Sequence, residues 1–156
     1  MLLAHRNINP GEGHEAGRAL LAQLYLQHTG MPMPPIVCTK LGKPFFQGCD
    51  LHFSITHTKN HVFCALSERP IGIDAEELTR TVVPQLADKL LSATEKMRYA
   101  AAPDKNRALL TFWVLKEATG KMTGQGMQLW PNHTDFSLDD PRVSQQHGCL
   151  LAVIEE

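Results

Sequence analysis

The chain has 156 residues, of which 43% are apolar and 20% are charged, values that are typical of a globular domain and exclude a disordered or fibrous chain. Lys and Arg total 15 and Asp and Glu total 16, so the formal charge of −1 excludes a surface built throughout for nucleic acid. The longest nearly apolar run is far shorter than a bilayer span, and the first residues do not have the pattern of a secretion signal. We therefore expect one cytoplasmic domain over residues 1–156, with no nucleic-acid partner and no membrane partner.

The first part of the chain is expected to contain one helix, a short strand and a β-hairpin. Apolar residues recur at helical spacing over residues 13–28, and Thr29 and Gly30 provide a stop signal. A short strand is expected at residues 36–39. Alternating residues over 51–56 and a second apolar run over 62–66 then predict two antiparallel strands joined by a polar turn.

The second part of the chain is expected to begin with a strand, continue with three helices and end with a strand. Alternation over residues 71–76 predicts the strand, and Pro84 is placed to open the first helix. The pattern Ser-Ala-Thr-Glu at 92–95 is a capping box that starts the second helix, and the third is expected from about residue 104 to residue 123. The last strand covers residues 148–154. This order of elements indicates an α+β fold with a mostly antiparallel sheet.

Two carboxylates share one face of the strand at residues 71–76. Asp74 and Glu76 are two residues apart, so they point to the same side and lie about 7 Å apart along the strand. The apolar residues Ile71, Ile73 and Ala75 point to the other side. Two carboxylates this close favour a cation or a proton between them, and a divalent metal such as Mg2+ prefers carboxylate oxygens. A solvated polar face on an edge strand would have the same spacing, so the strand alone leaves both interpretations open.

The third helix adds another carboxylate and a lysine. Trp113, Glu117 and Lys121 occur at positions i, i+4 and i+8, so they share one face of the helix. This pattern fits an exposed Glu–Lys pair beside a core tryptophan, and it fits equally well a third carboxylate with a nearby cation that faces the strand pair. Spacing alone does not choose between the two.

Four short motifs stand in a fixed order along the chain. They are Gly-Lys-Pro at 42–44, Phe-Ser-Ile-Thr-His at 53–57, Gly-Ile-Asp-Ala-Glu at 72–76 and Trp-Val-Leu-Lys-Glu-Ala-Thr-Gly-Lys at 113–121. Together they resemble the 4'-phosphopantetheinyl transferase superfamily, and they are most similar to its single-chain, surfactin-synthetase-activating type in a shortened form. The resemblance implies two similar α/β halves about a pseudo-twofold axis, at about residues 1–68 and 69–156, with coenzyme A between them.

The resemblance also implies a reaction. Enzymes of this family transfer the 4'-phosphopantetheine group of coenzyme A to a serine of an acyl or peptidyl carrier protein and release adenosine 3',5'-bisphosphate. By resemblance, Asp74, Glu76 and Glu117 hold Mg2+ on the pyrophosphate, Glu117 is the catalytic base, and Lys121 stabilises the departing charge. These roles suit the chemistry, which needs charge neutralisation and a base for the serine proton.

Basic and hydroxyl side chains are expected on the coenzyme A side of the site. By resemblance, Thr56 and His57 contact the phosphates and Lys43 lies against the adenine region. Arg18, with Arg6 as a further candidate, would supply charge for the 3'-phosphate, because a guanidinium binds phosphate bidentately. Arg18 would instead be a solvated residue of its helix if it has no ligand, and His57 would be an ordinary hairpin residue.

Two other functions use the same residues. The chain could be a weak or inactive relative that binds coenzyme A or a carrier domain without turnover, or a Mg2+-dependent hydrolase of a nucleotide pyrophosphate. The intact set of Asp74, Glu76, Glu117 and Lys121 favours the active transferase. Lys116, which precedes Glu117, is interpreted equally well as a structural or a functional residue.

Overall fold

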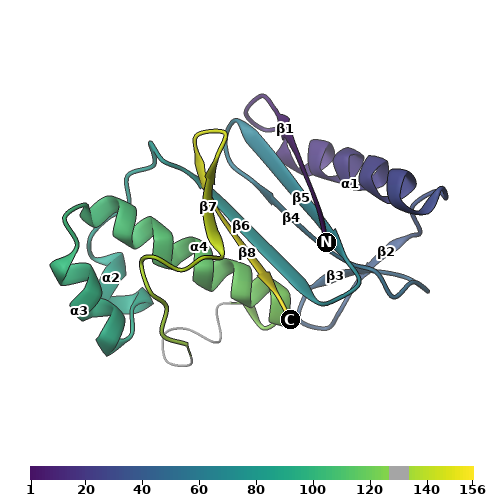
Figure 1. Cartoon of the computed structure of the whole chain (residues 1–156). Coiled ribbons are helices and arrows are strands. Elements are labelled where there is room, and N and C mark those ends of the chain that lie inside the picture. Colours follow the sequence, from purple (N-terminus) through teal and green to yellow (C-terminus); the bar gives the residue numbers. More distant parts are fainter. Residues whose placement is uncertain (127–133) are drawn as a thin grey trace.

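A computed structural model describes residues 1–126 and 134–156 of the chain (Figure 1). The first part contains the expected helix, short strand and hairpin, together with two strands that the sequence analysis did not predict, β1 and β3. In chain order the elements are β1 (Leu2–Asn7), α1 (Gly13–Thr29), β2 (Ile36–Cys38), β3 (Pro44–Phe46), β4 (His52–His57) and β5 (His61–Ser67).

The second part also follows the expected order and contains one additional strand, β7. Its elements are β6 (Ile71–Glu77), α2 (Leu86–Leu90), α3 (Ala93–Ala101), α4 (Lys105–Thr123), β7 (Val143–Gln146) and β8 (Cys149–Glu155). The capping box predicted at Ser92 is present, because the Ser92 hydroxyl accepts the backbone N–H of Glu95 and the Glu95 side chain accepts that of Ser92. Within the described residues, no helix is both long and apolar enough to cross a membrane. The fold is therefore a mixed α/β structure with antiparallel sheets, as expected.

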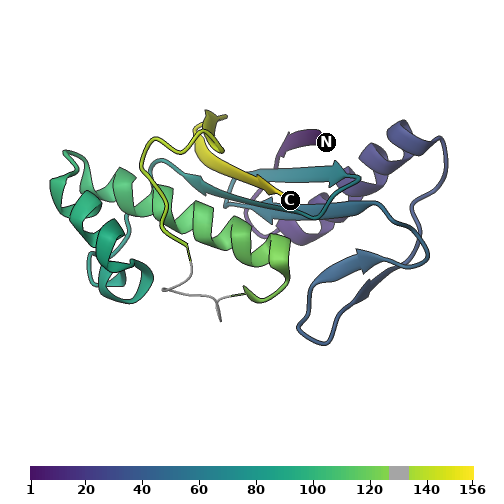
Figure 2. The same ribbon diagram turned by 60° about the horizontal axis from the view of Figure 1, so that its bottom comes forward.

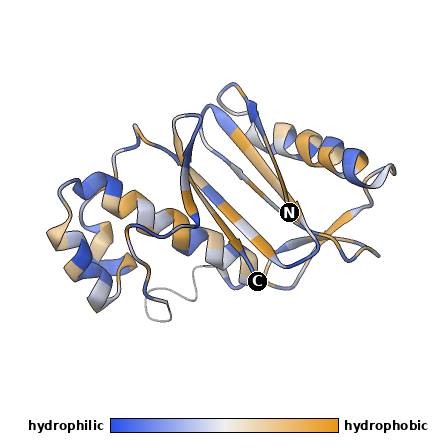
Figure 3. Ribbon diagram, viewed as in Figure 1, coloured by the Kyte–Doolittle hydropathy of each residue, from blue (hydrophilic) through white to orange (hydrophobic). Residues whose placement is uncertain are grey.

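The first antiparallel sheet has the strand order β1-β5-β4, and α1 covers one of its faces. Val62, Cys64 and Leu66 of β5 form one apolar cluster with Leu20 and Leu21 of α1. Figure 3 shows apolar residues along β5 of this sheet and also along β8. The apolar stripe predicted from helical spacing is thus the face by which α1 packs on the sheet.

The second antiparallel sheet has the strand order β6-β8-β7, and α4 lies across it (Figure 2). A Cβ atom at Gly72 of β6 would lie 1.9 Å from the carbonyl oxygen of Ala118 and 2.4 Å from the backbone nitrogen of Met122. Only glycine allows the backbone of α4 to approach the strand this closely. Asp74 lies two residues further along β6, so its side chain faces the same helix.

Strands β4 and β6 belong to different sheets but lie side by side, and we call their contact the β4–β6 junction. The backbone N–H of Ile73 donates to the Ser54 hydroxyl over 3.0 Å, and that of Ala75 donates to the Thr56 hydroxyl over 3.3 Å. Buried apolar residues of both sheets, including Phe63 and Ile73, form one cluster behind the junction. Hydroxyl side chains and a shared core therefore join the two sheets.

Candidate active site

A cavity of about 410 Å³ lies where α1, the loop before β3, β4 and the C-terminal end of α4 meet. Its walls include cationic side chains from the first part of the chain and a carboxylate and a lysine from the second. The residues that line it are His14, Arg18, Leu41, Gly42, Lys43, Pro44, Phe53, Ser54, Ile55, His57, Glu117, Gly120, Lys121, Gly124 and Gly126. Five of the residues predicted for the site, Arg18, Lys43, His57, Glu117 and Lys121, therefore face one space.

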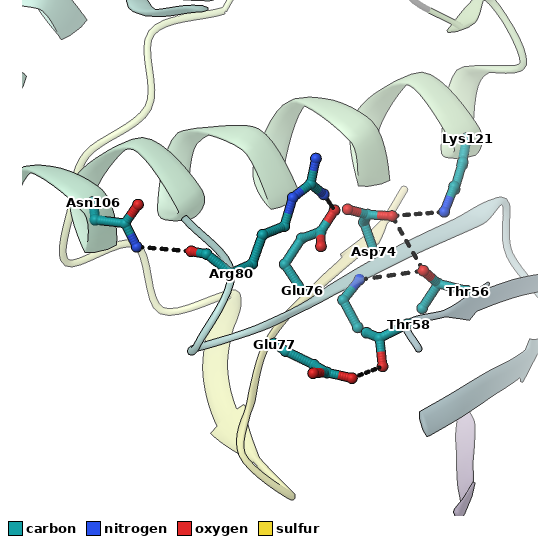
Figure 4. Close-up of polar contacts among 9 residues, drawn as sticks. Thr56, Thr58, Asp74, Glu76, Glu77, Arg80, Asn106 and Lys121 are labelled. Atoms are coloured by element: carbon teal, nitrogen blue, oxygen red, sulfur yellow. Dashed lines mark hydrogen bonds and ion pairs between the residues drawn. The ribbon is translucent and has the colours of Figure 1, made fainter. Parts of the chain in front are cut away.

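Asp74 is buried at the β4–β6 junction, with 6% of its surface exposed. Its Oδ1 accepts hydrogen bonds from Lys121 Nζ over 2.7 Å and from the Thr56 hydroxyl over 3.2 Å (Figure 4). Burial raises the pKa of Asp74 from its ordinary value of 3.8 to about 6, an increase that the neighbouring Lys121 only partly offsets. The solvated-face interpretation of this strand is thus wrong for Asp74, because α4 covers that side of β6.

Glu76 and Arg80 form an ion pair four residues apart. The Arg80 guanidinium also lies over the ring of Trp113, 5.3 Å from its centroid, and the Arg80 carbonyl accepts a hydrogen bond from the Asn106 side chain (Figure 4). Arg80 therefore connects the strand carboxylate to the face of α4 that carries Glu117. The sequence analysis did not single out Arg80, and its spacing from Glu76 was the only signal that could have indicated it.

Glu117 lies on the cavity wall, one helical turn before Lys121. Burial raises its pKa, and the negative charge of Glu76 acts in the same direction, while Lys121 and Arg80 oppose the increase. A carboxylate with a raised pKa is a stronger proton acceptor than an exposed glutamate. The helix face predicted from the i, i+4, i+8 spacing therefore faces the strand carboxylates, and the interpretation as an isolated surface pair is wrong.

The cavity is also lined by the basic residues expected to contact the ligand. Arg18 and His57 line it from α1 and β4. His14 lies there as well, although the sequence analysis did not select it, and its position in the first turn of the helix that carries Arg18 was the available signal. Lys43 donates a hydrogen bond to the carbonyl of Met122, and burial lowers the pKa of its ammonium group.

Two residues considered for ligand contact lie elsewhere. The Thr56 hydroxyl is buried and directed at Asp74 and at the backbone of Ala75 instead of into the cavity. The reason is the alternation of β4, which turns His57 toward the cavity and Thr56 toward β6. Arg6 is exposed on β1 and donates to the Gln23 side chain, away from the residues that line the cavity.

Two of the predicted metal ligands form ion pairs with cations of the protein itself. Asp74 is bound by Lys121 and Glu76 by Arg80, and across residues 1–126 and 134–156 no three His, Cys, Asp or Glu side chains are grouped as a metal site. However, Asp74 Oδ2 is buried and has no hydrogen-bond partner in this described part of the chain. A buried carboxylate oxygen without a donor suits a hard cation, so the donor set fits Mg2+ once its side chains adjust.

Lys116 has a structural contact. Its ammonium group is 5% exposed and lies 2.8 Å from Oε2 of Glu95, whose side chain is fully buried. Glu95 Oε1 accepts the backbone N–H of Phe136. The pair therefore joins α3, α4 and the segment before β7, which supports the structural interpretation of Lys116.

Comparison with known proteins points to one family. A family model for the 4'-phosphopantetheinyl transferase superfamily matches residues 70–152, more than half of the chain. The 4'-phosphopantetheinyl transferase gsp of Aneurinibacillus migulanus is 29% identical over 72% of this chain and 48% of its own length. The 4'-phosphopantetheinyl transferase Sfp of Bacillus subtilis (strain 168) is 36% identical over 56% of this chain and 40% of its own length. This chain thus spans about half the length of the curated relatives it matches.

Proposed function

This chain belongs to the 4'-phosphopantetheinyl transferase superfamily, and we propose that it transfers the 4'-phosphopantetheine group of coenzyme A to a serine of an acyl or peptidyl carrier protein. The reaction depends on Mg2+ and releases adenosine 3',5'-bisphosphate. The observation that carries the proposal is the cavity of about 410 Å³, whose lining combines Arg18, Lys43 and His57 with Glu117 and Lys121 of α4. Coenzyme A carries a 3'-phosphate and a pyrophosphate on one ribose, and these anionic groups suit a cavity lined by several cations.

We assign the acid–base work to Glu117. Its raised pKa makes it a better acceptor for the proton of the carrier serine, and its place on the cavity wall gives it access to that hydroxyl. Lys121, one helical turn further along, stabilises the negative charge that develops on the departing phosphate. Both groups come from α4, which Gly72 allows to lie close to β6.

Asp74, Glu76 and Glu117 would hold the metal ion in this proposal. The partnerless Oδ2 of Asp74, noted above for the described residues, is the atom that fits it best. When bound, Mg2+ would neutralise the charge of the pyrophosphate. Thr56 keeps the other oxygen of Asp74 in place through its hydrogen bond and so orients the carboxylate.

In this proposal the basic residues that line the cavity bind the nucleotide end of coenzyme A. Arg18 and His57 bind its phosphates, and Lys43 lies along the adenine region. We also propose that residues 1–68 and 69–156 are similar halves about a pseudo-twofold axis. This arrangement is supported by the three-stranded antiparallel sheet and the long helix that each half contains.

The test is incubation with coenzyme A, Mg2+ and a small panel of apo carrier proteins, followed by intact-mass measurement of each carrier. We expect one carrier to gain the mass of phosphopantetheine, and we expect the Glu117→Gln variant to label it far more slowly. Binding of coenzyme A without any labelling of the carriers would favour a non-catalytic relative. Release of free phosphopantetheine without carrier labelling would favour a hydrolase.

A further inference from the structure

Asp74 is paired with a cation of the protein itself. Lys121 Nζ lies 2.7 Å from its Oδ1, and the Thr56 hydroxyl donates to the same oxygen over 3.2 Å. Its Oδ2 is buried without a donor among the residues that the structure describes. One carboxylate oxygen is thus satisfied by the protein, and the other is free to bind a cation.

Lys121 can leave this contact without a change in the fold. About a third of its side chain is exposed (33%), and it lines the cavity that is expected to receive phosphates. A lysine side chain has a flexible stem, so its ammonium group can move between neighbouring acceptors while α4 stays in place. The Thr56 hydroxyl would stay on Oδ1 and keep Asp74 oriented after Lys121 leaves.

We propose that Lys121 competes with the divalent cation for Asp74, and that a phosphate group in the cavity ends this competition by drawing Lys121 away. Two cations on one buried carboxylate repel each other, so a metal ion alone binds weakly while Lys121 remains in place. A ligand phosphate gives Lys121 another partner, so metal and ligand each strengthen the binding of the other. The identity of that ligand as coenzyme A rests on the proposed function, whereas the competition between lysine and metal does not.

The second ion pair of the site follows the same principle. Arg80 pairs with Glu76 as Lys121 pairs with Asp74, so each strand carboxylate has a cation of the protein as its partner. Lys121 is the one of the two that lines the cavity. It is therefore the cation that a bound phosphate can reach directly, and the residue through which ligand and metal are coupled.

The test measures metal affinity without any turnover. Mn2+ is titrated into the purified full chain at pH 8, and the free ion is followed by electron paramagnetic resonance. We expect Lys121→Met to bind Mn2+ alone about tenfold more tightly than the wild type, since coupling between sites is typically 5- to 150-fold. Lys121→Arg keeps the competing charge and should stay within about twofold of the wild type. If Lys121→Met is poorly folded, Lys121→Gln takes its place with the same expected direction.

Two controls show whether the effect comes from Asp74. Lys96→Met removes a charge from an exposed pair with Asp88, 3.9 Å long, and should leave Mn2+ affinity unchanged. Asp74→Asn should remove the gain when it is combined with Lys121→Met. Unchanged or weaker Mn2+ binding by Lys121→Met, or an equal gain in Lys96→Met, would overturn the proposal.

A second titration includes coenzyme A. It should tighten Mn2+ binding by the wild type more than by Lys121→Met, because only the wild type has a lysine to release. If coenzyme A tightens Mn2+ binding by both proteins to the same extent, the coupling through Lys121 is overturned. If Lys121→Met binds Mn2+ alone more tightly but coenzyme A changes neither protein, the competition stands and the proposed donor is wrong.

Discussion

The hydroxyl of Thr56, on β4, donates a hydrogen bond to Oδ1 of Asp74, on β6, over 3.2 Å. The same hydroxyl accepts the backbone N–H of Ala75, so one side chain satisfies a donor and an acceptor of the neighbouring strand. The two strands belong to different sheets, so this hydrogen bond links the first part of the chain to the Asp74 carboxylate in the second part. Thr56 is therefore a positioning residue for Asp74.

Removal of this hydroxyl should weaken both the fold and the site. Thr56→Val keeps the shape but leaves the Ala75 N–H without its acceptor, and we expect it to lower the free energy of unfolding by about 1–3 kcal/mol. Its Mn2+ affinity should fall as well, because Asp74 loses a contact that orients it. Urea unfolding and Mn2+ titration measure the two effects. Thr56→Ser should restore both, and equal values for Val and Ser would contradict this role.

The buried ion pair between Lys116 and Glu95 should contribute strongly to stability. Lys116→Met leaves the fully buried Glu95 without a counter-charge, and loss of one partner of such a pair costs about 3–5 kcal/mol. The double variant Glu95→Gln/Lys116→Met should recover part of that loss, because no charge then remains buried. Lys96→Met, in an exposed pair, is the matched control and should change stability by less than about 1 kcal/mol. Equal stability of Lys116→Met and Lys96→Met in urea would disprove the structural role.

Helices and strands with a clear local sequence pattern were predicted correctly. The capping box at Ser92 and Glu95 fixed the start of α3, and the helical spacing around Glu117 gave the face of α4 that meets the site. Of the strands that were not predicted, β1 is partly exposed and β7 is mostly polar. Strand β3 begins at Pro44, and a proline there is also typical of a turn. The pairing of β1 depends on β5, far along the chain, which local periodicity does not contain. Strands β3 and β7 pair with their chain neighbours β2 and β8, but they are short and lack a clear alternation of apolar and polar residues.

The sequence indicated which residues belong to the candidate site, but not which elements cover and bury them. Period-two alternation placed Asp74 and Glu76 on one side of their strand, but it could not show that α4 covers that side. The signal was Gly72, whose lack of a side chain is needed only because a helix backbone lies against it. The direction of Thr56 follows from the same alternation, once β6 is known to lie beside β4.

Burial of Asp74 should give the metal-free protein a characteristic pH dependence. Its pKa of about 6 in the folded state lies above its ordinary value of 3.8, so between these values the folded protein binds more protons than the unfolded chain. The contribution of Asp74 to the free energy of unfolding should therefore fall as pH rises from about 4 to about 6, by on the order of 2–3 kcal/mol, and lose no more above that range. Asp74→Asn should lack this fall in urea unfolding with EDTA present. Asp88→Asn, at an exposed residue, should retain it, and a parallel pH profile for Asp74→Asn and the wild type would refute the assignment.

Arg18 should discriminate coenzyme A from dephospho-coenzyme A. If its guanidinium binds the 3'-phosphate, its loss removes a charged hydrogen bond of about 1.5–3 kcal/mol, which is roughly 10- to 100-fold in affinity. Calorimetry with both ligands should show that the wild type prefers coenzyme A and that Arg18→Ala does not. Arg6→Ala is the matched control, because Arg6 contacts Gln23 outside the cavity. Equal preference in Arg18→Ala and the wild type would assign the 3'-phosphate to another residue, such as His57.

The last prediction separates Glu117 from Lys121, which share one face of α4. Glu117→Gln keeps the volume but removes the proton acceptor, so it should lower turnover by about 10²- to 10⁴-fold and weaken coenzyme A binding less. Lys121→Ala should lower turnover and also weaken coenzyme A binding, because in the proposed mechanism its charge contacts the phosphates in the ground state as well as in the transition state.

Asp74→Ala should have the largest effect on metal-dependent ligand binding, and excess EDTA should abolish carrier labelling by every variant and by the wild type. The measurements are the rate of carrier modification by intact mass and the affinity for coenzyme A with and without Mg2+. Arg6→Ala, at an exposed residue outside the cavity, should match the wild type in both. If Glu117→Gln labels a carrier at the wild-type rate, the base is another group, and the mechanism fails even though the family is correct, since only the proton acceptor on α4 was removed.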